Sequence, residues 1–148
     1  MIRRLEPAEL PRLECGAREF YQASAFLGDF DIATFCKVWD QLLSGSTAAI
    51  FADVAETGRV NGALGGIIHR ELYGARLIAD EFFWFMRPDS RETLAGVRLY
   101  FAFEQWARAQ GAAEIQMCHL LDSMPEKVAR FYLRQGYKPI EMRFAKAL

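Results

Sequence analysis

Apolar residues at helical spacing predict two helices in the first third of the chain. Leucine, alanine and aromatic residues recur three and four positions apart in residues 7–25, which predicts one helix there. Asp31 is a suitable N-cap for a second helix that continues through Leu43 with one apolar side. Gly45 follows at a common position for a helix end. A short strand over residues 2–5 is expected to precede this helix pair.

The middle of the chain has the apolar and β-branched composition of strands. Residues 47–55 and 60–71 flank the turn sequence Glu56-Thr57-Gly58-Arg59 and predict an antiparallel hairpin. Residues 77–86 carry large apolar side chains at successive positions, as a central strand buried on both faces does. Pro88 is expected to end this strand, because proline has no amide hydrogen to donate to a ladder.

The last third of the chain alternates between helix and strand patterns. A turn and a long helix are predicted for residues 91–110, followed by a strand over residues 113–120. Pro125 suits the first turn of a further helix that stops at Gly136, and residues 138–146 predict a final strand, or two with a bend. The order β-α-α-β-β-β-α-β-α-β predicts a single α+β domain over residues 1–148, with helices flanking a mixed sheet.

Composition and charge narrow the classes of function. The 148 residues are 52% hydrophobic and 25% charged, an ordinary globular mixture rather than that of a disordered chain. The net charge of −1 and the lack of a basic–aromatic stripe argue against a nucleic-acid binder, and no apolar run is long enough for a membrane span. The three cysteines are odd in number and widely spaced, which favours reduced thiols in a cytoplasmic protein over a disulfide framework or a metal site.

The junction between the central strand and the long helix is a candidate phosphate-binding site. The first amides of a helix lack internal partners and carry the positive end of its dipole, so they bind phosphate groups well. Arg91 and Arg98 would add positive charge on either side, and Gly96 would allow a ligand close to the backbone. Most strand–turn–helix junctions bind nothing, so this segment alone does not decide the function.

The same junction resembles motif A of the GCN5-related N-acetyltransferase superfamily. In that family a Gln/Arg-x-x-Gly-x-Gly/Ala turn holds the pyrophosphate of acetyl-CoA. This chain has Arg91-Glu92-Thr93-Leu94-Ala95-Gly96, in which the arginine and the last glycine match and Leu94 replaces the first glycine. Downstream, Tyr132 to Pro139 is similar to the motif B pattern Tyr-x-x-x-Gly-Phe/Tyr-x-Pro. Together the two motifs cover residues 77–140, and their style looks most like small acetyltransferases of bacteriophages or prophages.

This resemblance implies a fold and a cofactor site. The fourth and fifth strands of the family splay apart, and the pantetheine arm of acetyl-CoA lies in the gap. By position, backbone groups of Phe85 and Met86 would pair with that arm, and Ser123 would contact the cofactor from the loop after the fifth strand. The turn would supply the arginine and the amides that hold the pyrophosphate. Its residues are Arg91, Glu92, Thr93, Leu94, Ala95, Gly96 and Val97.

The resemblance and the residue chemistry together suggest catalytic groups. Tyr132 matches the family tyrosine that hydrogen-bonds or protonates the departing thiolate as a general acid. Glu81 is the candidate general base, because a carboxylate among aromatic side chains has a raised pKa. Asp80 is the alternative, and since strand side chains alternate, only one of the two can face the cleft. Each of these side chains could instead have a purely structural role.

The resulting expectation is direct transfer of an acetyl or other short acyl group from acyl-CoA to a primary amine. The acceptor, a small molecule or a peptide amine, is left open, as is homodimer formation. A non-catalytic module that binds CoA or a protein partner is the alternative from another class. A nucleophilic pair of Cys118 and His119 is a minor alternative, and neither histidine has metal-ligand spacing. Aromatic residues of the two N-terminal helices are expected to be mostly core, with some lining an acceptor pocket.

Overall fold

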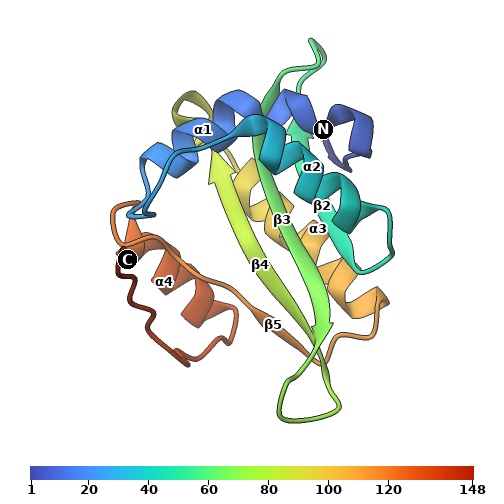
Figure 1. Cartoon of the computed structure of the whole chain (residues 1–148), viewed down its shortest axis with the longest axis vertical. Helices are drawn as coiled ribbons and strands as arrows, with labels where there is room; N and C mark the ends of the chain where they lie inside the picture. Colours follow the sequence, from blue (N-terminus) through green and yellow to red (C-terminus); the bar gives the residue numbers. More distant parts are fainter.

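A mixed five-stranded sheet organises the chain (Figure 1). The computed structural model describes residues 1–148. Strands β1 to β4 pair antiparallel in the order β1-β2-β3-β4, and β5 pairs parallel with β4. The elements in chain order are β1 (Ile2–Arg4), the 3₁₀ helix η1 (Pro7–Leu13), α1 (Glu14–Gln22), α2 (Ile32–Leu43), β2 (Ala48–Val54), β3 (Val60–Arg70), β4 (Leu77–Met86), the 3₁₀ turn η2 (Pro88–Ser90), α3 (Ala95–Ala109), β5 (Glu114–Gln116) and α4 (Pro125–Arg134).

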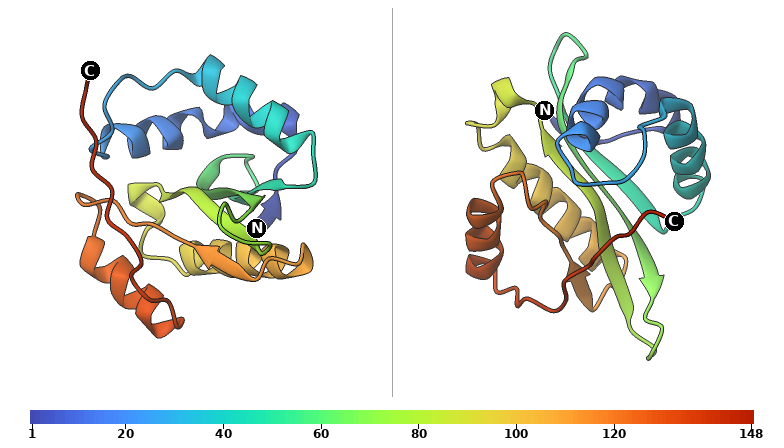
Figure 2. Two further views of the ribbon diagram at one scale, coloured as in Figure 1. Left: turned by 60° about the horizontal axis from the view of Figure 1, so that its bottom comes forward. Right: turned by 60° about the vertical axis from the view of Figure 1, so that its left-hand side comes forward.

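Helices cover both faces of this sheet, as strand alternation requires. In β2, Ala48, Ile50 and Ala52 point to the core beneath η1, α1 and α2, whereas Ala49 points to the core beneath α3. Figure 2 shows the sheet edge-on, with α1 and α2 on one side and α3 on the other. The expected mixed sheet with flanking helices is therefore confirmed. None of the helices combines the length and apolar character that crossing a bilayer requires.

The helix expected over residues 7–25 is two pieces. Residues 7–13 form the 3₁₀ helix η1, and a regular α-helix begins only at Glu14 and ends at Gln22. Pro11 lies inside η1 and has no amide hydrogen for an α-helical bond, which accounts for the break. The second helix agrees with its prediction, because Asp31 accepts a hydrogen bond from the Thr34 amide at 2.7 Å.

A bulge between β3 and β4 changes which side chains of β4 face which core. Gly65 pairs with Phe83 and Gly66 with Glu81, so Phe82 has no partner on β3. The glycines permit close approach: a Cβ on Gly66 would lie 2.5 Å from the carbonyl oxygen of Asp80. The extra residue puts Phe83 on the face covered by α1 and α2, while Glu81 shares the opposite face with Leu77 and Ala79.

Strand β5 is shorter than the predicted strand over residues 113–120. It pairs with β4 only through Glu114–Gln116, opposite Ile78, Ala79 and Asp80. Beyond this point the two strands diverge, and the Cys118 amide donates to the side chain of Glu81 rather than to a β4 carbonyl. The strand therefore ends early because a carboxylate replaces its ladder partner, and the gap expected between β4 and β5 opens there.

The strand predicted for residues 138–146 is absent. The backbone of residues 138–148 makes no hydrogen bond, and the last one before it joins the Tyr137 amide to the Tyr132 carbonyl. A β-strand is stabilised by hydrogen bonds to a neighbouring strand, and no strand lies along this segment. The sequence pattern was that of a strand, but the pairing partner it requires is missing.

Candidate functional site

A cavity of about 400 Å³ opens where β4 and β5 diverge. It is lined by α1, the end of β4, the turn before α3, the loop after β5 and the first turns of α4. This is the gap in which the pantetheine arm was expected. Of the predicted cofactor-binding residues, nine line it: Phe85, Met86, Arg91, Glu92, Thr93, Leu94, Gly96, Val97 and Ser123.

The turn before α3 supplies free amides to this cavity. The amide of Arg98 is the first to bond within the helix, to the Leu94 carbonyl, so those of Gly96 and Val97 have no partner. The amide of Ala95 is different, because the Thr93 hydroxyl accepts from it at 3.2 Å, and Ala95 does not line the cavity. Leu94 has a φ of −76°, so the glycine it replaces is not needed for a positive φ in this turn.

Two residues of this turn lie differently with respect to the cavity. Gly96 lines it, and a Cβ there would lie 3.3 Å from Met86 Cγ, so the glycine also allows close packing of α3 on β4. Arg98, which was expected to add positive charge on one side of this turn, does not line the cavity. The cations that do line the cavity are Arg91, whose Nε donates to the Met86 carbonyl at 3.0 Å, and Lys127 on α4.

Of the three acidic residues that line the cavity, Glu19, Glu81 and Glu92, only Glu81 is buried. Its side chain is buried, and its Oε2 accepts hydrogen bonds from the amide of Cys118 at 3.1 Å and from the thiol of Cys118 at 3.3 Å. Burial raises the pKa of Glu81 to about 7, although the hydrogen bonds from Cys118 oppose the rise. A carboxylate that is half ionised near neutral pH can both accept and release a proton there.

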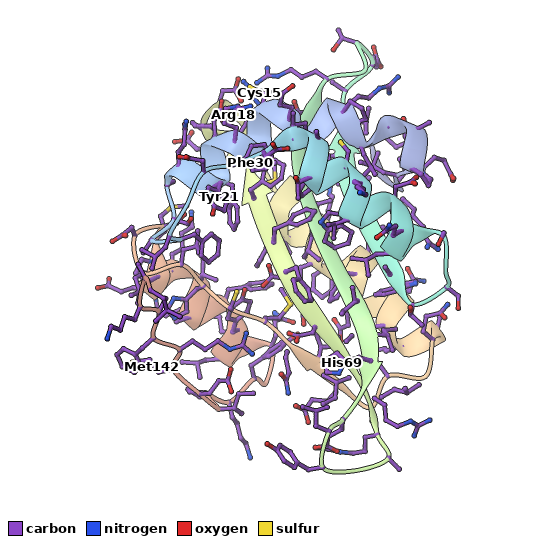
Figure 3. All side chains as sticks on the ribbon, in the orientation of Figure 1. Cys15, Arg18, Tyr21, Phe30, His69 and Met142 are labelled. Atoms are coloured by element: carbon purple, nitrogen blue, oxygen red, sulfur yellow. The ribbon has the colours of Figure 1, made fainter.

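Asp80 points elsewhere. Its carboxylate lies 3.5 Å from the ring of His69, and neither residue lines the cavity. Figure 3 shows His69 toward the end of β3, away from the helix α1 that carries Cys15 and Arg18. The geometry therefore separates the two acids that the sequence left as alternatives, and it associates Glu81 alone with the cavity.

Tyr132 lies next to the same carboxylate. Its side chain is buried, and its hydroxyl donates to the carbonyl of Cys118 at 2.7 Å. Burial and the nearby charge of Glu81 raise the pKa of Tyr132, so the hydroxyl stays protonated at physiological pH. Burial and Glu81 also raise the pKa of the Cys118 thiol to about 12, which is the opposite of what a nucleophilic cysteine needs. Glu81 and Tyr132 therefore both hydrogen-bond to Cys118, Glu81 with its amide and thiol and Tyr132 with its carbonyl.

Helix α1 contributes a wall of the cavity. Phe20 is the one member of the N-terminal aromatic set that lines it, whereas Gly16 and Glu19 were not predicted from the sequence. Nothing in their spacing distinguishes them from core residues. Lys127 had a usable signal, since it lies in the first turn of a helix that the resemblance already placed beside the cofactor. No group of three or more histidine, cysteine or acidic side chains is arranged to hold a metal ion.

Solved structures share this arrangement over the whole chain. An acetyltransferase from Trypanosoma brucei superposes with a TM-score of 0.74 at 17% identity, covering 100% of this chain and 99% of its own. Glucosamine-6-phosphate N-acetyltransferase from Arabidopsis thaliana gives 0.74 at 17% identity, with coverage of 99% and 97%. AAC(6')-Iy in complex with the bisubstrate analogue CoA-S-monomethyl-acetylneamine gives 0.77 at 15% identity, with coverage of 100% and 97%. The chain has the fold of the GCN5-related N-acetyltransferases.

The GCN5-related fold explains the splayed strands and the position of the cavity between them. No family model matches the sequence, and a search of curated proteins found no match. The similarity to this fold is therefore carried by the course of the backbone.

Proposed function

We propose that this protein transfers an acetyl or other short acyl group from acyl-CoA to a primary amine. One observation carries the proposal: two buried groups of suitable protonation, Glu81 and Tyr132, meet at Cys118 where β4 and β5 part. The same cavity reaches free helix amides and the cations Arg91 and Lys127. A single domain over residues 1–148, working in the cytoplasm, would contain all of these parts.

The residues present fit an acyl-CoA co-substrate. The amides of Gly96 and Val97 and the charges of Arg91 and Lys127 suit phosphate groups, and the diverging edge of β4 leaves room for an extended arm. When bound, the thioester supplies an activated acyl group. Phe85, Met86 and Ser123 line the same space and would position that arm.

The two buried groups would divide the proton transfers. Glu81 would accept the proton that the amine loses as its nitrogen bonds to the acyl carbon, directly or through water. Tyr132 would donate a proton or a hydrogen bond to the sulfur as the carbon–sulfur bond breaks. For that step its hydroxyl must leave the Cys118 carbonyl, a hydrogen bond of ordinary length. Direct transfer is favoured over an acyl-cysteine route, because the Cys118 thiol is held protonated.

The proposal is tested by binding and then by turnover. Calorimetric titration with acetyl-CoA should show saturable binding, and no binding at millimolar ligand would refute the proposal. Release of free CoA thiol is then measured with a panel of amines: polyamines, amino sugars, aminoglycosides, amino acids and peptides with free N-termini or lysines. The structures similar to this chain include enzymes named for an amino sugar and for aminoglycosides, so those acceptors lead the panel.

A binding module without turnover is the second candidate. The exposed Glu92 in the amide-bearing turn favours it, since a carboxylate beside phosphate groups weakens their binding. Acetyl-CoA binding without thiol release for any amine on the panel would support this candidate. Amine-dependent release would exclude it.

A further inference from the structure

Cys118 hydrogen-bonds to both candidate catalytic groups. The chain after β5 runs between β4 and α4 (Figure 1), and there Cys118 meets one side chain from each of these elements. Its amide and its thiol donate to Oε2 of Glu81 at 3.1 Å and 3.3 Å, and its carbonyl accepts from the Tyr132 hydroxyl at 2.7 Å. Acyl transfer by Glu81 and Tyr132 leaves the thiol itself without a role.

The thiol is the part of these contacts that depends on the type of residue. Other residues at position 118 would supply the same backbone amide and carbonyl, whereas the thiol is particular to cysteine. Burial and the charge of Glu81 raise the pKa of the Cys118 thiol to about 12. The thiol therefore keeps its proton, and remains a donor, over the whole range of pH in which a carboxylate titrates.

Both hydrogen bonds from Cys118 fall on the same oxygen of Glu81. Oε2 accepts from the amide and from the thiol, whereas Oε1 has no hydrogen-bond partner in the protein. The polar atoms that are buried without a partner do not include Oε1, so this oxygen is open to the cavity that Glu81 lines. Two donors on Oε2 fix the orientation of the carboxylate and leave Oε1 as the oxygen that can accept a proton from an amine.

We propose that Cys118 is a positioning residue for acyl transfer: by donating to Oε2, its thiol stabilises the ionised form of Glu81 and directs Oε1 towards the amine. The thiol proton stays on sulfur throughout, while the amine proton passes to Oε1 as the nitrogen bonds to the acyl carbon. A hydrogen bond is stronger when its acceptor is charged, so the donor favours the carboxylate over the carboxylic acid. This role rests on the proposed acyl transfer, in which Glu81 is the base.

The groups around Glu81 act on its ionisation in opposite directions. Burial is the main cause of its raised pKa, and the like charge of Asp80 on the same strand adds to the rise. On β3 the residue paired with Glu81 is Gly66, and the charge of Arg143 in the C-terminal segment lowers the pKa of Cys118. The other ionisable groups that line the cavity are Glu19, Arg91, Glu92, His119, Lys127 and Tyr132. The hydrogen bonds from Cys118 oppose the rise in the pKa of Glu81.

The first test compares Cys118→Ala with Cys118→Ser by carbon-13 NMR of the Glu81 carboxyl group, assigned with Glu81→Gln. Both replacements are small and admit water to a similar extent, but serine keeps a donor and alanine does not. The pKa of Glu81 should rise by about one pH unit in Cys118→Ala, because a hydrogen bond to the charged form is lost, and should stay within about half a unit in Cys118→Ser. Cys36→Ala, on α2 and outside the cavity, should titrate like the wild type.

The same difference should appear in turnover. The base must be ionised, so kcat/KM rises with pH through the pKa of Glu81. A rise in this pKa from about 7 to about 8 reduces the ionised fraction at pH 7 from about one half to about one tenth, so Cys118→Ala should be about fivefold slower than Cys118→Ser. At about pH 9.5 both carboxylates are ionised and the two rates should be equal. The ratio of the two rates cancels the titration of the amine.

Several results would overturn the role of Cys118. They are a Glu81 that titrates alike in Cys118→Ala and Cys118→Ser, a lower pKa in Cys118→Ala because the thiol only excluded water, the same shift in Cys36→Ala, or a loss of rate in Cys118→Ala that persists at about pH 9.5. The NMR titration needs no substrate. A protein that acetylates no amine would therefore overturn the acyl transfer, whereas equal titrations in an active enzyme would overturn the role of Cys118 alone. Circular dichroism and thermal unfolding verify that all variants are folded.

Discussion

Replacing Glu81 by glutamine should change how the stability of this protein depends on pH. In the folded state burial raises the pKa of Glu81 to about 7, from an ordinary value of 4.5. Between pH 4.5 and 7 the folded state therefore holds a proton that the unfolded chain has lost. The stabilisation by Glu81 is fully present below pH 4.5 and is lost as the pH rises through 7. Glutamine has no such titration.

The size of the effect follows from the raised pKa. A difference of about 2.5 pH units, at 1.36 kcal/mol for each unit, corresponds to about 3 kcal/mol. The free energy of unfolding of the wild type, relative to Glu81→Gln, should fall by about this amount between pH 4.5 and 8. Hydrogen bonds that the glutamine loses or gains change its free energy of unfolding by the same amount at every pH, so they leave the pH-dependent difference unchanged.

Urea unfolding of both proteins at pH 4.5, 6 and 8 measures this difference directly. Glu92→Gln is the matched control, because Glu92 is an exposed carboxylate of the same cavity. Its free energy of unfolding should follow that of the wild type. If the curves of the wild type and Glu81→Gln stay parallel within about 1 kcal/mol, the carboxylate is not desolvated and the argument for a general base at this position fails.

Three further changes test separate parts of the site. Tyr132→Phe should lower kcat by about 100-fold, the lower end for loss of a general acid, and leave the acetyl-CoA dissociation constant within about twofold; unchanged turnover would remove Tyr132 from the mechanism. Lys127→Ala should weaken CoA about tenfold without affecting pantetheine, while Lys37→Ala, exposed on α2, should change neither; equal loss for both ligands would show that Lys127 does not contact phosphate. Gly66→Ala should reduce the free energy of unfolding by about 1–3 kcal/mol in urea titrations, because its Cβ would meet a backbone oxygen at 2.5 Å, whereas Gly45→Ala meets nothing closer than 3.8 Å and should be nearly neutral. Equal stabilities of the two alanine variants would contradict the close packing at the bulge.

Local patterns in the sequence predicted most of the elements. The cap at Asp31, the apolar and β-branched composition of residues 47–55 and the prolines at Pro88 and Pro125 are local signals, so a single sequence is enough to interpret them. The resemblance to the acetyltransferase motifs placed Tyr132 and the turn before α3 in one cavity. The strand predicted for residues 138–146 is absent because a strand needs a neighbouring strand to bond to, and no local pattern shows whether one is present.

The local sequence could not decide between Asp80 and Glu81 for a similar reason. Alternation predicts that the two acids face opposite sides, but the bulge at Phe82 decides which side chains of β4 share a face with Glu81. That bulge depends on Gly65 and Gly66, which lie on the neighbouring strand. Arg98 does not line the cavity, which the sequence of the turn alone could not predict.

Product analysis after incubation with acetyl-CoA and the amine panel tests the central claim most directly. Mass spectrometry should detect an amine heavier by one acetyl group, formed in equal amount to the free CoA thiol. Formation should slow with Tyr132→Phe and with Glu81→Gln, while acetyl-CoA still binds to both variants. Acetyl-CoA binding with no acetylated amine, or acetylation at the wild-type rate in both variants, would contradict catalysis by the pair that meets at Cys118.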